Sequence, residues 1–336
     1  MTAPPIFIVG APRSGTSLLR QMLNRHPALA ICDETHFFRL IWQKRRRDAF
    51  GDLSDPANRR RLVNEYVQLR PTQRLGLNCE KLAERLIEEG SSYPQLFASV
   101  LQYYAESLGK TRCGEKTPLH AFAVNTLCEW FPGAYILHIV RDPRDVVASL
   151  LRMPFGSSSV VLNARTWLHR NVAARQASHH DHYLEVRYET LIAEPERQLT
   201  DLCRFIGEEF SPSMLIAEQS GVQRPDERDR FHAPLTKARL GRWRQELSAR
   251  QVAQIEWVVG PQLEAFGYAR EARSPSMAAV LGGLSHAALA QTRQNFSKLP
   301  ALWFSLASPR EIAKYESLAR RKAWATNEQG AKTGPQ

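Results

Sequence analysis

The sequence predicts an α/β fold in which helices flank a central parallel sheet of the P-loop type. Three observations indicate this fold. Strand-like and helix-like patterns alternate along much of the chain. An apolar run from Ile6 to Val9 leads directly into a loop bounded by Gly10 and Gly15. A second apolar run, Tyr135 to Val140, ends in a polar sequence that begins at Arg141. Ligands of open α/β sheets bind at such strand ends.

The segment after the first loop supplies a helix and an acidic strand end. Apolar residues at helical spacing predict a helix from about Thr16 that ends near His26, because the residue before a proline avoids the helical region. Residues 28–32 then predict a second strand, which ends at Asp33 and Glu34. We expect this acidic pair to lie near the first loop, because parallel strands end at one edge of the sheet.

The later elements follow the same alternation. Residues 37 to about 110 predict a helical insertion over the sheet. The strand at Tyr135 to Val140 is followed by a helix that Asp142 can cap, with Pro143 in its first turn. Further predicted elements are a strand at Tyr183 to Tyr188, a helix at Pro195 to Ile206, and a helix opened by a capping box of Ser248 and Gln251.

Length and charge predict one catalytic domain with a basic tail. A chain of 336 residues with 43% hydrophobic content can form a large core, which we assign to residues 1–269. Residues 270–336 are predicted to be a helical extension whose last ten or so residues are disordered. This extension holds ten Lys or Arg against four Glu, so it carries +6 of the net charge of +11.

Composition argues against several classes of protein. The basic clusters are not interleaved with aromatic residues, so no nucleic-acid partner is expected. No run of about 18 apolar residues and no signal peptide are present, so we expect a cytoplasmic protein without a transmembrane segment. Five cysteines without a CxxC spacing argue against a disulfide framework and against a zinc site. The sequence leaves open a homodimer and a peripheral contact of the tail with a membrane.

The first loop has the residues of an anion site. Gly10 and Gly15 have the spacing of a Walker A loop, but Thr16 stands where that loop has its lysine, and Ser17 follows. The glycines allow successive N–H groups and the helix N-terminus to point at one anion. Arg13 adds a planar, permanently charged donor. The loop therefore predicts a phosphate or sulfate site.

Two motifs together resemble the sulfotransferases that use 3′-phosphoadenosine 5′-phosphosulfate (PAPS). Residues 12–17, Pro-Arg-Ser-Gly-Thr-Ser, look like the 5′-phosphosulfate loop of that family. Arg141-Asp-Pro-Arg-Asp, with Ser149 on the following helix, looks like the 3′-phosphate motif. The resemblance covers about residues 5–269. Within the family, the run from His26 to Thr35 is most similar to tyrosylprotein sulfotransferases and to bacterial enzymes with a glutamate base.

The resemblance implies a role for each matching residue. It implies that the 5′-phosphosulfate is held by Arg13, Ser14, Gly15, Thr16 and Ser17, and that the 3′-phosphate is held by Arg141 and Ser149. It implies further that Tyr188 and Arg242 help to fix the nucleotide. The stretch Gly114-Glu-Lys-Thr-Pro resembles a family motif with a catalytic cation, here Lys116. PAPS would be the co-substrate and PAP its product.

The chemistry of sulfuryl transfer asks for the same residue types. Charge spreads over the transferred oxygens, and Arg13 and Lys116 can stabilise it. An acceptor hydroxyl must lose its proton, and Glu34 is the predicted general base, with His36 as the alternative. No metal is expected, because the leaving phosphate is weakly basic. The alternatives without a catalytic role are that Glu34 caps a helix and that Lys116 is a solvated loop residue.

Two other functions remain as alternatives at this stage. A P-loop nucleotide kinase or NTPase would share the loop, although Thr16 replaces its lysine. A non-catalytic nucleotide-binding scaffold would share both motifs. The acceptor is also open: a small molecule, a lipid, a glycan and a peptide tyrosine all carry a suitable hydroxyl. No peptide-recognition signature is visible in residues 37–110.

Overall fold

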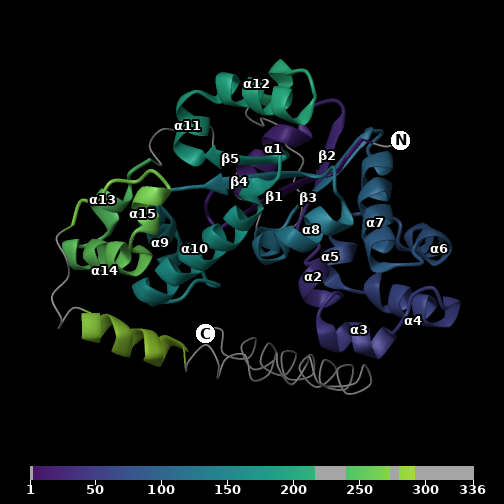
Figure 1. Ribbon diagram of the computed structural model, residues 1–336, viewed down its shortest axis with the longest axis horizontal. Helices are drawn as coiled ribbons and strands as arrows, with labels where there is room; N and C mark the ends of the chain where they lie inside the picture. Colours follow the sequence, from purple (N-terminus) through teal and green to yellow (C-terminus); the bar gives the residue numbers. More distant parts are fainter. Residues whose placement is uncertain (1–2, 216–239, 273–279, 292–336) are drawn as a thin grey trace, which may run out of the picture.

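The predicted parallel sheet is confirmed in the computed structural model, which describes residues 3–215, 240–272 and 280–291. Five parallel strands lie in the order β2-β3-β1-β4-β5 (Figure 1). They are β1 (Ile6–Gly10), β2 (Leu29–Cys32), β3 (Arg112–Lys116), β4 (Tyr135–Val140) and β5 (Tyr183–Arg187). All five carboxyl ends therefore share one edge of the sheet.

The central strand β1 is buried on both faces, which is why its sequence is continuously apolar. Its side chains alternate between two layers. Phe7 and Val9 lie in the cluster formed with the helices of residues 37–107, whereas Ile6 and Ile8 lie in the cluster formed with α1 (Thr16–Asn24) and α12 (Pro195–Ile206). The sheet is thus covered on both faces.

The predicted helical insertion after β2 is present. It consists of α2 (Phe37–Leu40), α3 (Lys44–Phe50), α4 (Pro56–Tyr66), α5 (Arg70–Gln73), α6 (Cys79–Glu89) and α7 (Tyr93–Ser107). These helices form the right-hand side of the molecule in Figure 1. Stacked rings hold them to the sheet, since the Phe37 ring lies 4.6 Å from that of Phe97, which in turn lies 6.0 Å from that of Phe7.

The remaining helices surround the other strands. They are η1 (Pro118–Ala123), α8 (Val124–Trp130), α9 (Pro143–Leu151), α10 (Val160–Arg175), η2 (Gln176–His179), α11 (Tyr188–Ala193), η3 (Pro212–Leu215), α13 (Trp243–Glu246), α14 (Ala249–Val259) and α15 (Gln262–Ala265). Two predicted helix starts are confirmed. The Asp142 side chain accepts a hydrogen bond from the Arg144 N–H, with Pro143 in the first turn, and Ser248 forms the capping box with Gln251.

Strand β3 was not predicted, and one strand end was placed wrongly. The sequence of β3, Arg-Cys-Gly-Glu-Lys, has no apolar alternation, yet all five residues are buried. Gly114 is required there, because a Cβ atom would lie 2.3 Å from the backbone oxygen of Ile6 on β1. The strand expected at Tyr183 to Tyr188 ends at Arg187, and Tyr188 is the first residue of α11.

Only part of the C-terminal extension can be compared with its prediction. Residues 280–291 form a helix in which Val280, Ala287 and Ala290 are buried. The rest of the extension, including the end predicted to be disordered, lies outside the described residues. Within the described ranges, no helix is long and apolar enough to cross a membrane.

A buried histidine in the sheet couples stability to pH. His138 on β4 is fully buried, with its Nε2 atom 2.9 Å from Asn171 Oδ1 and its Nδ1 atom 2.6 Å from the Tyr183 hydroxyl. A neutral imidazole satisfies both contacts by donating to the amide oxygen and accepting from the hydroxyl. Burial lowers the pKa of His138 to about 4, from a usual value of 6.5.

We expect this histidine to destabilise the fold as the pH falls from about 6.5 to about 4. The unfolded chain binds the proton first, so stability is complete above the unfolded pKa and is lost below it. The loss is on the order of 3 kcal/mol, since one pKa unit corresponds to about 1.4 kcal/mol. Urea unfolding at several pH values should show this loss in the wild type but not in His138→Gln. Parallel curves for the two proteins would contradict it.

Candidate active site

The loop after β1 has the geometry of an anion site. Gly15 has φ +100° and Arg13 has φ +70°, a left-handed conformation that non-glycine residues rarely adopt. No side chain caps the first turn of α1, so its N–H groups remain available for a ligand. The hydroxyl of Ser14 is buried and has no hydrogen-bond partner among the described residues. A buried unsatisfied hydroxyl is costly, and a bound anion would satisfy it.

The two predicted phosphate motifs meet in space. Arg13 Nε donates a hydrogen bond to Ser149 Oγ on α9, at 3.0 Å, across 136 positions of sequence. Arg141 donates to the backbone oxygen of Arg13 at 3.4 Å. The guanidinium of Arg141 also lies 4.4 Å from the ring centre of Tyr188. These four side chains therefore form one cationic group beside the loop.

Tyr188 also explains why the loop needs glycine at position 15. A Cβ atom on Gly15 would lie 2.4 Å from Cδ2 of the Tyr188 ring. The start of α11 thus closes against the loop, so that the aromatic ring, the loop backbone and Arg141 are in mutual contact. Tyr188 is thus held at the start of α11, against the loop backbone.

The side chain of Arg242 has its ion-pair partner on α13. It forms an ion pair with Glu246 at 2.7 Å and is half exposed. The neighbouring backbone is anchored to the cationic group, because Asp145 accepts two hydrogen bonds from N–H groups in residues 241–243. The same carboxylate lies 3.3 Å from Arg141.

The acidic strand end and the motif lysine form a second cluster. Lys116 Nζ lies 2.7 Å from both Asp33 Oδ1 and Glu34 Oε1. Lys116 is 2% exposed and belongs to β3, so it is not a solvated loop residue. Burial would raise the pKa of Asp33, but the charges of Lys116 and Arg20 outweigh it, and the pKa lies well below its usual value.

His36 lies beside Glu34 in a strained conformation. Its Nε2 atom is 3.3 Å from Glu34 Oε2, and its φ is +52°. Burial lowers the pKa of His36, and the charge of Glu34 opposes this effect. His36, and not Glu34, precedes the first residue of α2 as its N-cap. The helix-cap alternative for Glu34 is therefore wrong.

The strand order sets the two clusters side by side. Along the sheet edge, Glu34 follows β2, Lys116 ends β3, and the anion loop follows β1. Adjacent strands lie about 4.8 Å apart, so the lysine stands between the carboxylate and the loop. Arg141 and Tyr188 follow β4 and β5 on the other side. The strand order thus separates the side with the anion loop, Arg141 and Tyr188 from the side with the carboxylate.

Three residues of this region were not predicted. Glu115 is a fully buried carboxylate on β3, and Asp145 anchors residues 241–243. Arg170, on α10, is the third: burial lowers its pKa, and the charge of Glu34 opposes that change. Glu115 stood in the quoted lysine motif, where it could have been noticed. Arg170 is one of three arginines on α10, and no local pattern distinguishes it.

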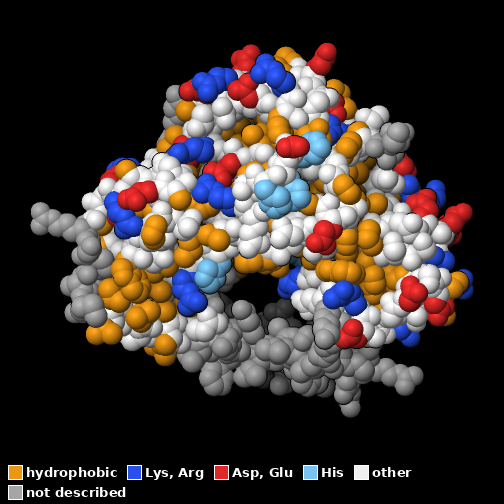
Figure 2. Space-filling view, viewed as in Figure 1, with side chains coloured by type: hydrophobic (Ala, Val, Ile, Leu, Met, Phe, Trp, Pro, Cys, Tyr) orange, Lys and Arg blue, Asp and Glu red, His pale blue; other side chains and the backbone are white. Residues whose placement is uncertain are grey.

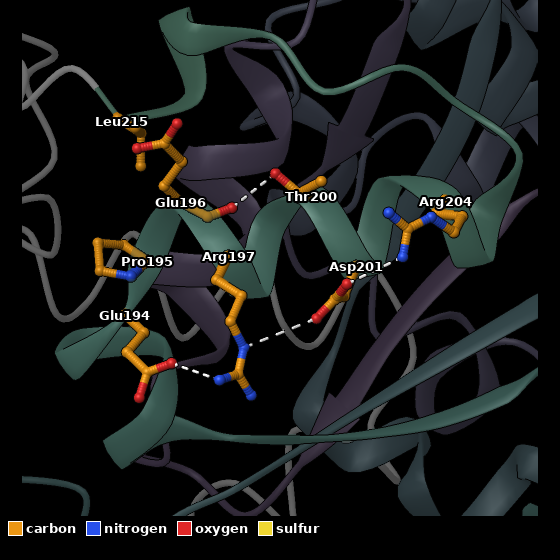
Figure 3. Close-up of a pocket in the computed structure, with 8 residues that line it drawn as sticks. All are labelled: Glu194, Pro195, Glu196, Arg197, Thr200, Asp201, Arg204 and Leu215. Atoms are coloured by element: carbon orange, nitrogen blue, oxygen red, sulfur yellow. Dashed lines mark hydrogen bonds and ion pairs between the residues drawn. The ribbon is translucent and has the colours of Figure 1, made fainter.

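Figure 2 shows a hollow in the surface between the α10 side and the α2–α3 side, with Lys or Arg side chains on both sides. A separate surface pocket of about 770 Å³ lies along α12, lined by residues 194–204 and Leu215 (Figure 3). Its lining includes none of the clustered residues, and both of its arginines are paired with carboxylates: Arg197 with Glu194 at 2.8 Å and Arg204 with Asp201 at 3.1 Å. Within the described residues, no group of His, Cys, Asp or Glu side chains is arranged to hold a metal ion.

Comparison with known proteins agrees with this geometry. A model of the sulfotransferase family matches residues 4–212, more than half of the chain. The chain belongs to the sulfotransferase family. Of the alternatives considered above, family membership disfavours a nucleotide kinase.

The matching relatives differ in the acceptors that their names give. A protein-tyrosine sulfotransferase of Drosophila melanogaster is 26% identical over 295 residues, which cover 81% of this chain and 53% of the relative. The omega-hydroxy-beta-dihydromenaquinone-9 sulfotransferase Stf3 of Mycobacterium tuberculosis (strain CDC 1551 / Oshkosh) is 32% identical over 247 residues, covering 61% and 63%. The chain therefore spans about half to two thirds of the length of these relatives.

Solved structures agree with the fold. The sulfotransferase domain of the Synechococcus PCC 7002 olefin synthase has a TM-score of 0.56 and 24% identity, and covers 80% of this chain and 97% of its own. The sulfotransferase domain of the curacin biosynthetic pathway has a TM-score of 0.54 and 21% identity, covering 80% and 99%. At these identities the likeness establishes the fold alone.

The contact between Gly15 and Tyr188 can be tested with a pair of glycine variants. Gly15→Ala should lower the free energy of unfolding by about 2–4 kcal/mol, because a left-handed backbone strain is combined with an overlap with the ring. Gly76→Ala is the matched control: its φ is +71°, but nothing lies within 4 Å of the added Cβ atom. It should cost about 1 kcal/mol. Equal losses in urea unfolding would show that the ring is not in contact.

Proposed function

We propose that this sulfotransferase moves the sulfuryl group of PAPS to an acceptor hydroxyl, giving PAP and a sulfate ester. The ion pair of Lys116 and Glu34 carries this proposal. It joins a carboxylate and a buried cation at 2.7 Å, and the strand order sets it beside the anion loop. A nucleotide-binding scaffold would need the loop and Arg141 but not this pair.

The residues on the side of the anion loop and Arg141, which we call the nucleotide side, fit the co-substrate. The backbone of the loop from Arg13 to Ser17, the N-terminus of α1 and the unsatisfied Ser14 hydroxyl would hold the 5′-phosphosulfate. Arg141 and Ser149 would hold the 3′-phosphate. Tyr188, whose ring lies against the Arg141 guanidinium, and Arg242 would help to fix the nucleotide. When bound, PAPS supplies a sulfuryl group on a weakly basic leaving phosphate, so we propose a reaction without a metal.

The carboxylate side fits the acceptor chemistry. Glu34 takes the proton of the acceptor hydroxyl as the oxygen bonds to sulfur and the bond from sulfur to the leaving phosphate breaks. Lys116 and Arg13 stabilise the charge on the transferred oxygens from fixed positions. Lys116 can do so at little cost, since its ammonium is already dehydrated and held by Asp33 and Glu34. Arg170 lies on the same side, where it adds positive charge toward Glu34.

Aromatic residues lie in α2 and η1, the segments that follow Glu34 and Lys116 in the chain. The Phe38 ring stacks on Trp130 at 5.0 Å and meets the His120 ring at 4.9 Å, and Phe122 on η1 is 57% exposed. We therefore propose an acceptor hydroxyl on an aromatic or lipid body. The names of the fly and mycobacterial relatives, which give tyrosine and a menaquinone, support this choice.

Titration calorimetry with PAP in metal-free buffer tests the nucleotide side. The wild type should bind PAP, and Arg141→Ala should weaken binding about 10- to 100-fold, the value of one or two charge-assisted hydrogen bonds. Arg152→Ala is the control. Arg152 lies at the C-terminal end of α9, the helix that follows Arg141, where it is half exposed and paired with Glu246. The affinity of this variant should stay within about twofold. Absence of PAP binding to the wild type would overturn the proposal.

Turnover of PAPS with naphthol and with dodecanol tests the base. Glu34→Gln should lower kcat by about 10²- to 10⁴-fold, the usual contribution of general-base catalysis, with PAP affinity unchanged. His36→Gln should lower kcat by less than about tenfold. The reverse order of the two effects would assign the base to His36.

A further inference from the structure

A buried carboxylate that the proposed chemistry does not use lies directly behind the Glu34 loop. Glu115 on β3 is 1% exposed. Its Oε1 atom accepts a hydrogen bond from the N–H of Thr35 at 3.1 Å, another from the Thr35 hydroxyl at 2.6 Å, and a short one from the Thr117 hydroxyl. His120 Nδ1 lies 2.8 Å from its Oε2 atom.

These contacts keep Glu115 charged inside the protein. Burial alone would raise the pKa of Glu115, but the charge of His120 and the hydrogen bonds from Thr117 and Thr35 outweigh burial and lower it. A buried anion persists only where its neighbours satisfy it. Its bonds to the neighbouring loop are therefore strong and directional.

Two adjacent residues of β3 hold three consecutive residues of that loop. Lys116 binds Asp33 and Glu34, and Glu115 binds Thr35. The Thr35 hydroxyl also accepts a hydrogen bond at 3.1 Å from the N–H that opens α2. The next residue, with φ +52°, is strained and needs such fixed neighbours.

We propose that Glu115 is a positioning residue, which acts through Thr35 to hold the Glu34 carboxylate against Lys116. The inference rests on the proposed function, since it takes Glu34 as the base. Glu115 does not touch the acceptor itself. Its effect is geometric: a shift of about 1 Å in a catalytic group can cost about 10²-fold in rate.

The two threonines provide a matched test. Both hydroxyls donate to the same oxygen of Glu115, but Thr35 belongs to the loop that carries Glu34, whereas Thr117 follows β3. If Glu115 has only a structural role, removing either hydroxyl should lower the stability and the activity of the enzyme to a similar extent. If Glu115 positions the base, only removal of the Thr35 hydroxyl should lower the activity.

The experiment compares Thr35→Val, Thr117→Val and Thr35→Ser in the full chain, with PAPS and whichever of naphthol or dodecanol the wild type turns over faster. Thr35→Val should lower kcat about 10- to 100-fold, with KM for the acceptor and Kd for PAP within about twofold. Thr117→Val should show a similar fall in melting temperature but keep kcat within about threefold. Thr35→Ser, which restores the hydroxyl, should return kcat to within about threefold of the wild type.

Further variants keep the outcomes distinct. If Thr35→Val does not fold, Thr35→Ala removes the same hydroxyl without adding a methyl group, and the same loss of kcat is expected. Equal kcat in the Thr35 and Thr117 variants, beside a large loss in Glu34→Gln, would overturn the positioning role and leave the base assignment standing. Wild-type kcat in Glu34→Gln would overturn both, and would identify the base assignment as the error.

Discussion

The arrangement of the site depends on the ion pairs of the buried Lys116 ammonium group with two carboxylates. Its side chain is 3% exposed, and two carboxylates lie 2.7 Å from its nitrogen. Leaving such a charge unpaired would cost several kcal/mol. The lysine therefore dictates the path of residues 33–35, and with it the position of the carboxylate that we assign as the base. Glu115 holds the same loop from behind.

The two halves of the parallel sheet supply different residues of the site. Because every strand ends at one edge, functional groups far apart in sequence are placed in spatial order by the strand order alone. The half with β4 and β5 supplies Arg141 and Tyr188, which gather around the loop. The half with β2 and β3 supplies Glu34 and Lys116. The loop after β1 lies between them.

Family membership and the solved structures fix the scaffold but not the acceptor. Relatives named for a tyrosine and for a menaquinone share this chain's family, although their acceptors differ in size and polarity. We propose that the segments around the common sheet, here the helices of residues 37–107 and η1, contact the acceptor. The exposed Phe122 and the stacked Phe38 belong to these segments, whereas the side that we propose binds the nucleotide is built from the sheet edge itself.

Features that depend on neighbours in the chain could be predicted from the sequence. Glycine spacing in the first loop, the Asp142 cap and the Ser248 capping box are local, and the structure has them. Strand β3 and the contacts of Glu115 depend instead on residues far away in the sequence. A strand reading Arg-Cys-Gly-Glu-Lys is stable in the sheet centre because distant residues neutralise its charges and β1 packs against Gly114. Pairing between distant charges leaves no periodic pattern in the sequence. It could therefore be identified only once the folded structure had brought these charges together.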